Sequence, residues 1–173
     1  MTHDVILRTK GVRMDIERLQ MLRYSIGCCL NSIPVGSSEQ NARCLGGWFC
    51  LLDLRKERSR WVVVDEPCGD RASDDCVTRD AALEHATRLA GNMHHRTSLE
   101  SGDPEQNQLA AAIRAGNWIF SFAGLPGRWN QVLMLAVACS QAMIPLRDLF
   151  SIQPDIDEYL RQLRSSPGTC HAT

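Results

Sequence analysis

Two short apolar runs separated by a charged segment place the strongest constraint on how this chain of 173 residues can fold. The run Trp48–Leu54 is too short for a typical helix, and Trp61–Asp65 contains three successive valines, which favour a β-strand. The loop between them is short, so the simplest connection is an antiparallel hairpin. Because both strands are apolar along their whole length, we expect helices on both faces of the sheet.

Several other segments carry apolar residues at the three- and four-residue spacing of a helix. The first begins near Met14, and its inward face is predicted to be Ile16, Leu19, Leu22, Ile26, Cys29, Leu30 and Ile33, with an end near Gly27. Further helices are predicted over Thr78–Gly91, Asp103–Gly116, Trp129–Met143 and Pro145–Phe150, and from Pro154 onward. A third strand is predicted at Trp118–Phe122, where large apolar residues alternate with smaller ones.

This order of elements predicts a helix-rich α+β fold with a small, mainly antiparallel, three-stranded sheet. The length suits one domain, which we place at residues 1–165 and follow with a flexible C-terminal tail at residues 166–173. No apolar run is long enough to span a membrane, and the first residues lack the apolar core of an export signal. Several of the eight cysteines lie among apolar residues, which is typical of reduced thiols. We therefore predict a cytoplasmic protein with free cysteines.

The charged segment of the hairpin is the most distinctive candidate binding feature. It holds four cations in six residues, which are Arg55, Lys56, Arg58 and Arg60, and tryptophans lie in both flanking strands. A basic tip beside aromatic rings can bind phosphates and stack bases. The formal net charge of the chain is −1, however, so a polyanion would have to be bound by local charge alone.

An aromatic group forms the second candidate surface. Its members cluster around a Gly-Pro turn and are Trp118, Phe120, Phe122 and Trp129. Aromatic residues are enriched at the centres of interfaces, but they also fill cores, and the sequence leaves both interpretations open. As binding residues we take Trp118 and Trp129 together with the four cations.

An enzyme is the first alternative. Cys76 precedes the helix that Thr78 is predicted to cap, where a helix N-terminus can activate a thiol, although nearby aspartates oppose thiolate formation. Acidic residues follow the valine strand, and Asp65, Glu66 and Asp70 could act as acid, base or magnesium ligands.

Metal and cofactor sites have weaker signals. Cys68, Cys76, His94 and His95 flank one predicted helix, but their spacing is not that of a zinc site. The glycines match no phosphate-binding loop. We therefore predict no metal and no cofactor, and whether these four residues converge in space is left to the structure.

Together these patterns predict a non-enzymatic module that binds another macromolecule, such as an accessory, adaptor or toxin-neutralising protein of a bacterium or mobile element. A protein partner is favoured, with direct nucleic-acid binding as the second alternative after an enzyme. The sequence leaves the oligomeric state open.

Overall fold

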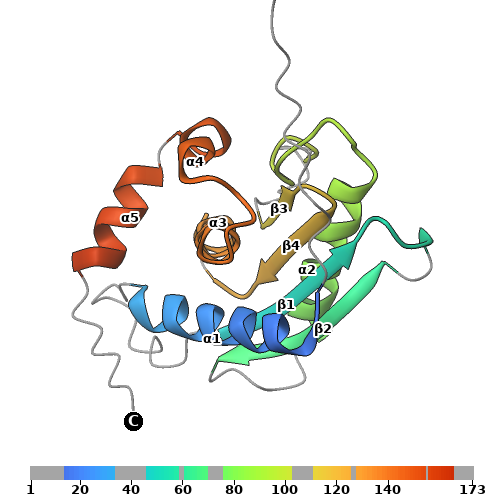
Figure 1. Ribbon diagram of the computed structural model, residues 1–173, viewed down its shortest axis with the longest axis horizontal. Helices are drawn as coiled ribbons and strands as arrows, with labels where there is room; N and C mark the ends of the chain where they lie inside the picture. Colours follow the sequence, from blue (N-terminus) through green and yellow to red (C-terminus); the bar gives the residue numbers. More distant parts are fainter. Residues whose placement is uncertain are drawn as a thin grey trace, which may run out of the picture.

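The computed structural model describes residues 14–33, 46–58, 61–69, 76–102, 111–125, 128–154 and 156–165, and it arranges them in three layers. A four-stranded sheet forms the middle layer, α1 and α3 lie on one face, and α2 lies on the other (Figure 1). The five described helices are α1 (Ile16–Ser32), α2 (Cys76–Ala90), α3 (Trp129–Ser140), α4 (Leu146–Ile152) and α5 (Ile156–Ser165). The α+β class is thereby confirmed, as is the prediction of helices on both faces.

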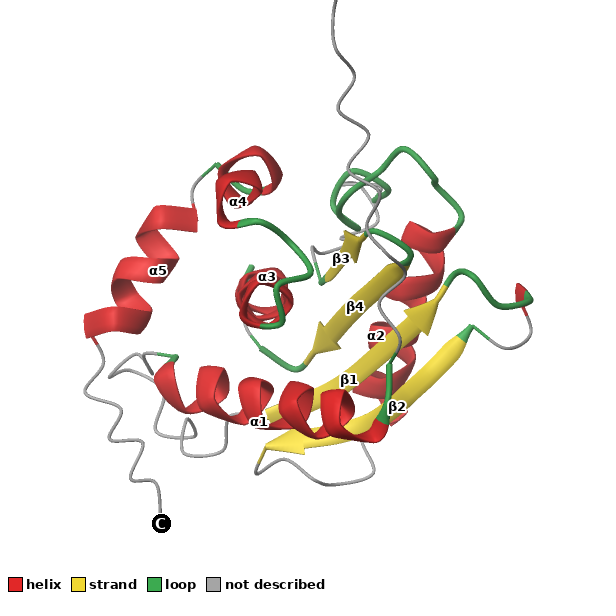
Figure 2. Ribbon diagram, in the orientation of Figure 1, coloured by secondary structure: helices red, strands yellow, loops and turns green. Residues whose placement is uncertain are grey.

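The sheet is antiparallel throughout, in the order β2-β1-β4-β3 (Figure 2). Its strands are β1 (Gly46–Asp53), β2 (Val62–Gly69), β3 (Ala112–Ala115) and β4 (Trp118–Ala123). The predicted hairpin is confirmed, since β1 and β2 pair directly. The expectation that both of its strands are buried holds for β1 alone. Because β2 is an edge strand, only Val64 among its side chains is fully buried.

The prediction of three strands is wrong, because β3 lies in a segment predicted to be helical. Ala112–Ala115 pairs with β4, and Gly116, with φ of 62°, begins the turn into it. Alanine and arginine favour a helix locally, but pairing with a buried strand outweighs that preference. The outer edge of β3 is covered in turn by the loop after α2, where Thr97 forms a bridge with Ile113. The rest of the predicted helix, residues 103–110, lies outside the described residues.

The larger core cluster lies between the sheet and the layer of α1 and α3. The sheet contributes Phe49, Leu51, Phe120 and Phe122, α1 contributes Leu22, Ile26 and Leu30, and α3 contributes Leu133 and Val137. Ile16, predicted to face inward, is 77% exposed. The stripe at residues 22, 26 and 30 faces the sheet instead, and Ile16 lies about 120° around the helix from Leu22. The helix also continues past Gly27 to Ser32.

The smaller core cluster lies beneath α2 on the opposite face. Ala82, Ala86 and Leu89 pack over Cys50, Leu52 and Ile119. Because alanine side chains are short, the helix axis can lie close to the strands. Of the helices in the described part of the chain, none combines the length and hydropathy required to cross a bilayer.

Candidate binding site at the hairpin tip

The hairpin tip, which we define as residues 54–61 between β1 and β2, is closed by backbone hydrogen bonds. The amide of Asp53 donates to the carbonyl of Trp61 at 2.8 Å, and the amide of Lys56 donates to the carbonyl of Asp53 at 3.2 Å. The amide of Leu54 donates to the carbonyl of Asn117 at 2.9 Å, which ties the hairpin tip to the turn between β3 and β4. The tip is therefore braced from two sides at one end of the sheet.

Arg55 is held by a buried carboxylate and an aromatic ring. Its Nε and Nη2 atoms donate to the two carboxylate oxygens of Asp53 at 2.8 and 2.9 Å. Its guanidinium carbon lies 4.7 Å from the centre of the Trp118 ring. The ion pair lowers the pKa of Asp53, because hydrogen bonds from Arg55 favour the carboxylate. The charge of Arg55 is thus neutralised within the molecule.

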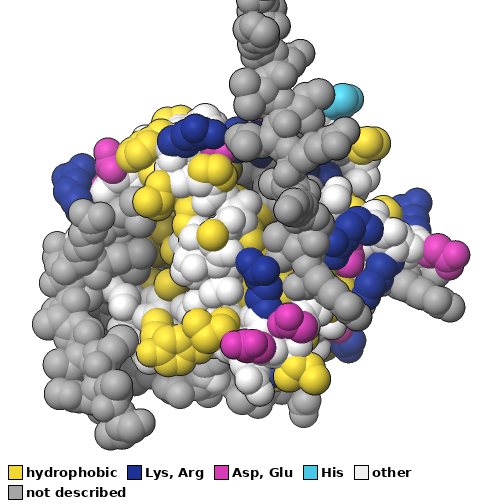
Figure 3. Space-filling view, in the orientation of Figure 1, with side chains coloured by type: hydrophobic (Ala, Val, Ile, Leu, Met, Phe, Trp, Pro, Cys, Tyr) yellow, Lys and Arg dark blue, Asp and Glu magenta, His cyan; other side chains and the backbone are white. Residues whose placement is uncertain are grey.

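In the described part of the hairpin tip, Lys56, Glu57 and Arg58 are exposed, as is Arg55 beside them. The backbone carbonyl of Lys56 accepts a 2.9 Å hydrogen bond from the indole Nε1 of Trp61. The guanidinium carbon of Arg58 lies 5.7 Å from the centre of the half-buried Trp61 ring. In Figure 3 basic side chains flank an acidic one where the hairpin tip projects. The fourth predicted cation, Arg60, lies outside the described residues.

The aromatic group does not form a continuous surface. Phe120 and Phe122 are fully buried in the core, and Trp118 is 4% exposed. Trp129 is half-buried and lies edge-on to Tyr159 of α5, with ring centres 4.9 Å apart. Trp118 begins β4 and Trp129 follows its end, so the length of that strand separates them. Of the two predicted binding tryptophans, Trp118 is the one that contacts the described hairpin tip, where Arg55 covers its ring.

The candidate catalytic acids are separated by the geometry of the strand. Consecutive side chains point to opposite faces of a sheet, and Asp65 and Glu66 each pair with a different helix. Asp65 binds Arg79 of α2 and accepts a hydrogen bond from the indole of Trp48. Glu66 forms two 2.7 Å hydrogen bonds with Arg23 of α1. These two carboxylates therefore attach the edge strand to both helical layers. Asp70 lies outside the described residues.

The Arg23–Glu66 pair also lines a cavity of about 270 Å³ between α1 and the end of β2. Gly27 and Cys68 contribute to the same lining. A Cβ atom at Gly27 would meet nothing within 4 Å, so the missing side chain contributes to the hollow.

The predicted cysteine and histidine candidates do not assemble. Within the residues that the structure describes, no three histidine, cysteine or acidic side chains are grouped so as to hold a metal ion. All six described cysteines are free thiols, which confirms that prediction for this part of the chain. Burial raises the pKa of Cys68 to about 12. Cys76 is exposed at the first residue of α2, two positions earlier than the predicted start of that helix.

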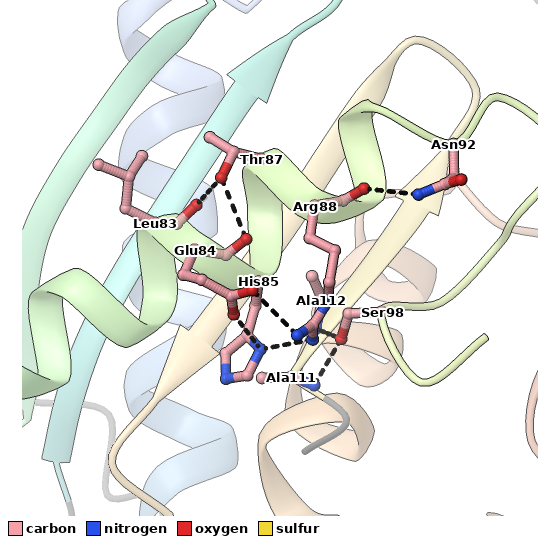
Figure 4. Close-up of polar contacts among 9 residues, drawn as sticks. All are labelled: Leu83, Glu84, His85, Thr87, Arg88, Asn92, Ser98, Ala111 and Ala112. Carbon is pink, nitrogen blue, oxygen red and sulfur yellow. Dashed lines mark hydrogen bonds and ion pairs between the residues drawn. The ribbon is translucent and has the colours of Figure 1, made fainter. Parts of the chain in front are cut away.

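A half-buried imidazole on α2 is a titratable group that the sequence did not single out. Figure 4 shows His85 between Glu84 and Arg88, whose guanidinium approaches the imidazole Nδ1 at 3.0 Å. Burial and the neighbouring cation lower the pKa of His85 to about 4. The same view shows Ser98, whose hydroxyl accepts hydrogen bonds from the amides of Ala111 and Ala112 and so anchors the start of β3.

Sequence reasoning missed the residues that organise the site. Asp53 is an acidic residue at the end of an apolar strand, two positions before Arg55, and that spacing was the available signal. Nothing in the sequence pattern paired Arg79 with Asp65 or Arg23 with Glu66, because both contacts join segments distant along the chain.

Apolar side chains also reach the surface, where Met21 and Tyr24 on the outer side of α1 are 50% and 65% exposed. Figure 3 shows hydrophobic side chains gathered over this helix.

Comparisons with models of protein families, with curated proteins and with solved structures found no match to this chain.

Proposed function

We propose that this protein is a non-enzymatic, cytoplasmic module that binds another macromolecule through the hairpin tip, in the manner of an accessory, adaptor or toxin-neutralising protein. The observation that carries the proposal is the stacking of Arg58 on Trp61 at an exposed turn. Arginine and tryptophan are the side chains most enriched among residues that dominate binding energy.

The bracing of the hairpin tip supports the same proposal. Binding costs about 0.5–1.5 kcal/mol for each flexible side chain that becomes immobilised. At the tip, the Trp61 indole is already held by the carbonyl of Lys56, and Arg55 by Asp53. Much of the ordering is therefore complete before a partner arrives, which favours a turn that acts as a contact surface.

An enzymatic function has less support. Asp65 and Glu66 point to opposite faces of β2, so they cannot act together on one substrate. Burial raises the pKa of Cys50 and Cys68 to about 12, which keeps both thiols protonated near neutral pH.

Photo-crosslinking from the hairpin tip tests the proposal. Glu57 is replaced by the photoreactive residue benzoylphenylalanine, and cells that make the full-length protein are irradiated. We expect a discrete covalent adduct that disappears when Lys56→Glu and Arg58→Glu are introduced together. The matched control is Arg147→Glu, which reverses an exposed cation on α4 whose nearest carboxylate is 3.7 Å away. An adduct that survives the double charge reversal, or the lack of any adduct, would contradict the proposal.

A further inference from the structure

We infer that the cavity between α1 and β2 binds a small zwitterion, a molecule such as a free amino acid that carries one ammonium and one acidic group. The cavity has a volume of about 270 Å³. This is just below the range of about 300–1,000 Å³ that is usual for ligand pockets, so it suits a small metabolite. It lies at the end of β2 opposite to the hairpin tip, and the inference is therefore independent of the function proposed above.

The hollow depends on a glycine inside a helix. Gly27 lies within α1, where glycine is less favourable than alanine, so its presence there calls for a physical reason. The usual reason is the close approach of a neighbouring element, but a Cβ atom at Gly27 would meet nothing within 4 Å. What the glycine provides is therefore space at the cavity wall, which a larger side chain would fill.

Opposite charges face each other at the same wall. The Nε and Nη2 atoms of Arg23 donate to the two carboxylate oxygens of Glu66 at 2.7 Å. The two side chains are 54% and 25% exposed, and an ion pair this accessible to water contributes little to stability, so it opens at small cost. The packing of α1 on the sheet through Leu22, Ile26 and Leu30 does not depend on the pair. Arg23 and Glu66 can therefore exchange their mutual contact for contacts with a ligand.

The pair selects for both charges in one ligand. An anion that took Arg23 from Glu66 would leave the carboxylate unpaired beside a like charge, and a cation on Glu66 would do the same to the guanidinium. A zwitterion replaces both contacts at once, with its acidic group on Arg23 and its ammonium on Glu66. Among the described lining residues, these two side chains are the ones charged near neutral pH, because burial raises the pKa of the Cys68 thiol to about 12.

Equilibrium dialysis of the full-length protein tests the inference. The probes are the standard amino acids and phosphoethanolamine, because the guanidinium fork of Arg23 suits a carboxylate and a phosphate alike. Mass spectrometry measures which probes the protein retains, and thereby shows which acidic group the site takes. We expect at least one to be retained, with an affinity that falls about tenfold or more in Gly27→Leu, which fills the hollow, and in Arg23→Gln, which removes a charged contact. The matched control is Gln20→Leu, which adds the same side chain at an exposed position of α1 and should leave the affinity unchanged.

Two derivatives of the retained probe test the requirement for both charges. N-acetylation removes the ammonium and esterification neutralises the acidic group, so neither derivative should bind. Retention of no probe overturns the inference. So does unchanged affinity in Gly27→Leu or Arg23→Gln, or an N-acetylated derivative that binds as tightly as its parent. Circular dichroism checks that each variant is folded, and Arg23→Gln alone decides the outcome if Gly27→Leu is not.

Discussion

The guanidinium carbon of Arg55 lies 4.7 Å from the centre of the Trp118 ring. The sequence placed these two residues on separate binding surfaces, but in the structure Arg55 covers Trp118. The contact joins the hairpin tip to the first residue of β4. It shows that two of the candidate binding residues support each other. In the described part of the tip, the cations that do not pair with Asp53 are Lys56 and Arg58.

The ion pair beneath this contact should contribute to stability. Arg55→Ala removes both side-chain hydrogen bonds from the nearly buried Asp53 carboxylate, and we expect the free energy of unfolding to fall by about 1–3 kcal/mol. Arg58→Ala is the matched control at the same tip, where the exposed cation should change stability by less than about 1 kcal/mol. Urea denaturation of both variants measures the difference. Equal effects would show that the Asp53 pair is not a structural contact.

His85 should make the protein less stable in mild acid. Burial and Arg88 lower the pKa of its imidazole in the folded state to about 4, below the value of about 6.5 in an unfolded chain. The unfolded state therefore takes up the proton first, and stability is lost as the pH falls from about 6.5 to about 4. The difference between the two pKa values corresponds to a loss of at most about 3 kcal/mol. Glu84 reduces this loss, because its carboxylate lies 3.2 Å from Nδ1 and favours the protonated ring.

The control for this pH effect is His85→Gln, which cannot titrate. Unfolding free energies from urea titrations across that pH range should show a shallower slope in the variant. Parallel curves for the wild type and the variant would rule out His85 as the source of the acid sensitivity.

Two glycines should respond to alanine in opposite directions. Gly27 lies inside α1 next to the cavity, and its added Cβ would meet no atom within 4 Å, so Gly27→Ala should stabilise the protein by about 0.5–1 kcal/mol. A Cβ at Gly47 would overlap the carbonyl oxygen of Ala123 on β4, and Gly47→Ala should destabilise by about 1–3 kcal/mol or more. Thermal and urea unfolding measure both. A destabilising Gly27→Ala would mean that the hollow beside it is smaller than described.

The described thiols should differ in reactivity. Burial raises the pKa of Cys50 to about 12 and that of Cys29 to about 11, whereas Cys76 is exposed. Alkylation requires an accessible thiolate, so iodoacetamide at neutral pH should label Cys76 first among these three. Peptide mass spectrometry over time follows each site, and denatured protein provides the reference rates. Equal labelling of Cys50 and Cys76 in the native protein would contradict the burial of the former.

The local patterns predicted much of the fold. The valine run and the run before it predicted the β1–β2 hairpin, and the spacing of Leu22, Ile26 and Leu30 predicted α1. The exposure of Ile16 could not be predicted, because neighbouring apolar stripes on a helix look equivalent until one of them meets a sheet. The strand at Ala112–Ala115 was missed because its residues prefer a helix and its partner strand decides otherwise.

The order of residues along the chain was sufficient for the class of fold and the position of the hairpin tip, because hydrophobic periodicity and turn chemistry act over a few neighbouring residues. Which partners the charges of that tip meet depended in part on contacts between distant segments. The Arg55–Asp53 pair is local, but Trp118 lies beside Arg55 only because β4 pairs with β1. Such contacts form where elements pack together, and the energy of packing depends on partners that local patterns do not identify.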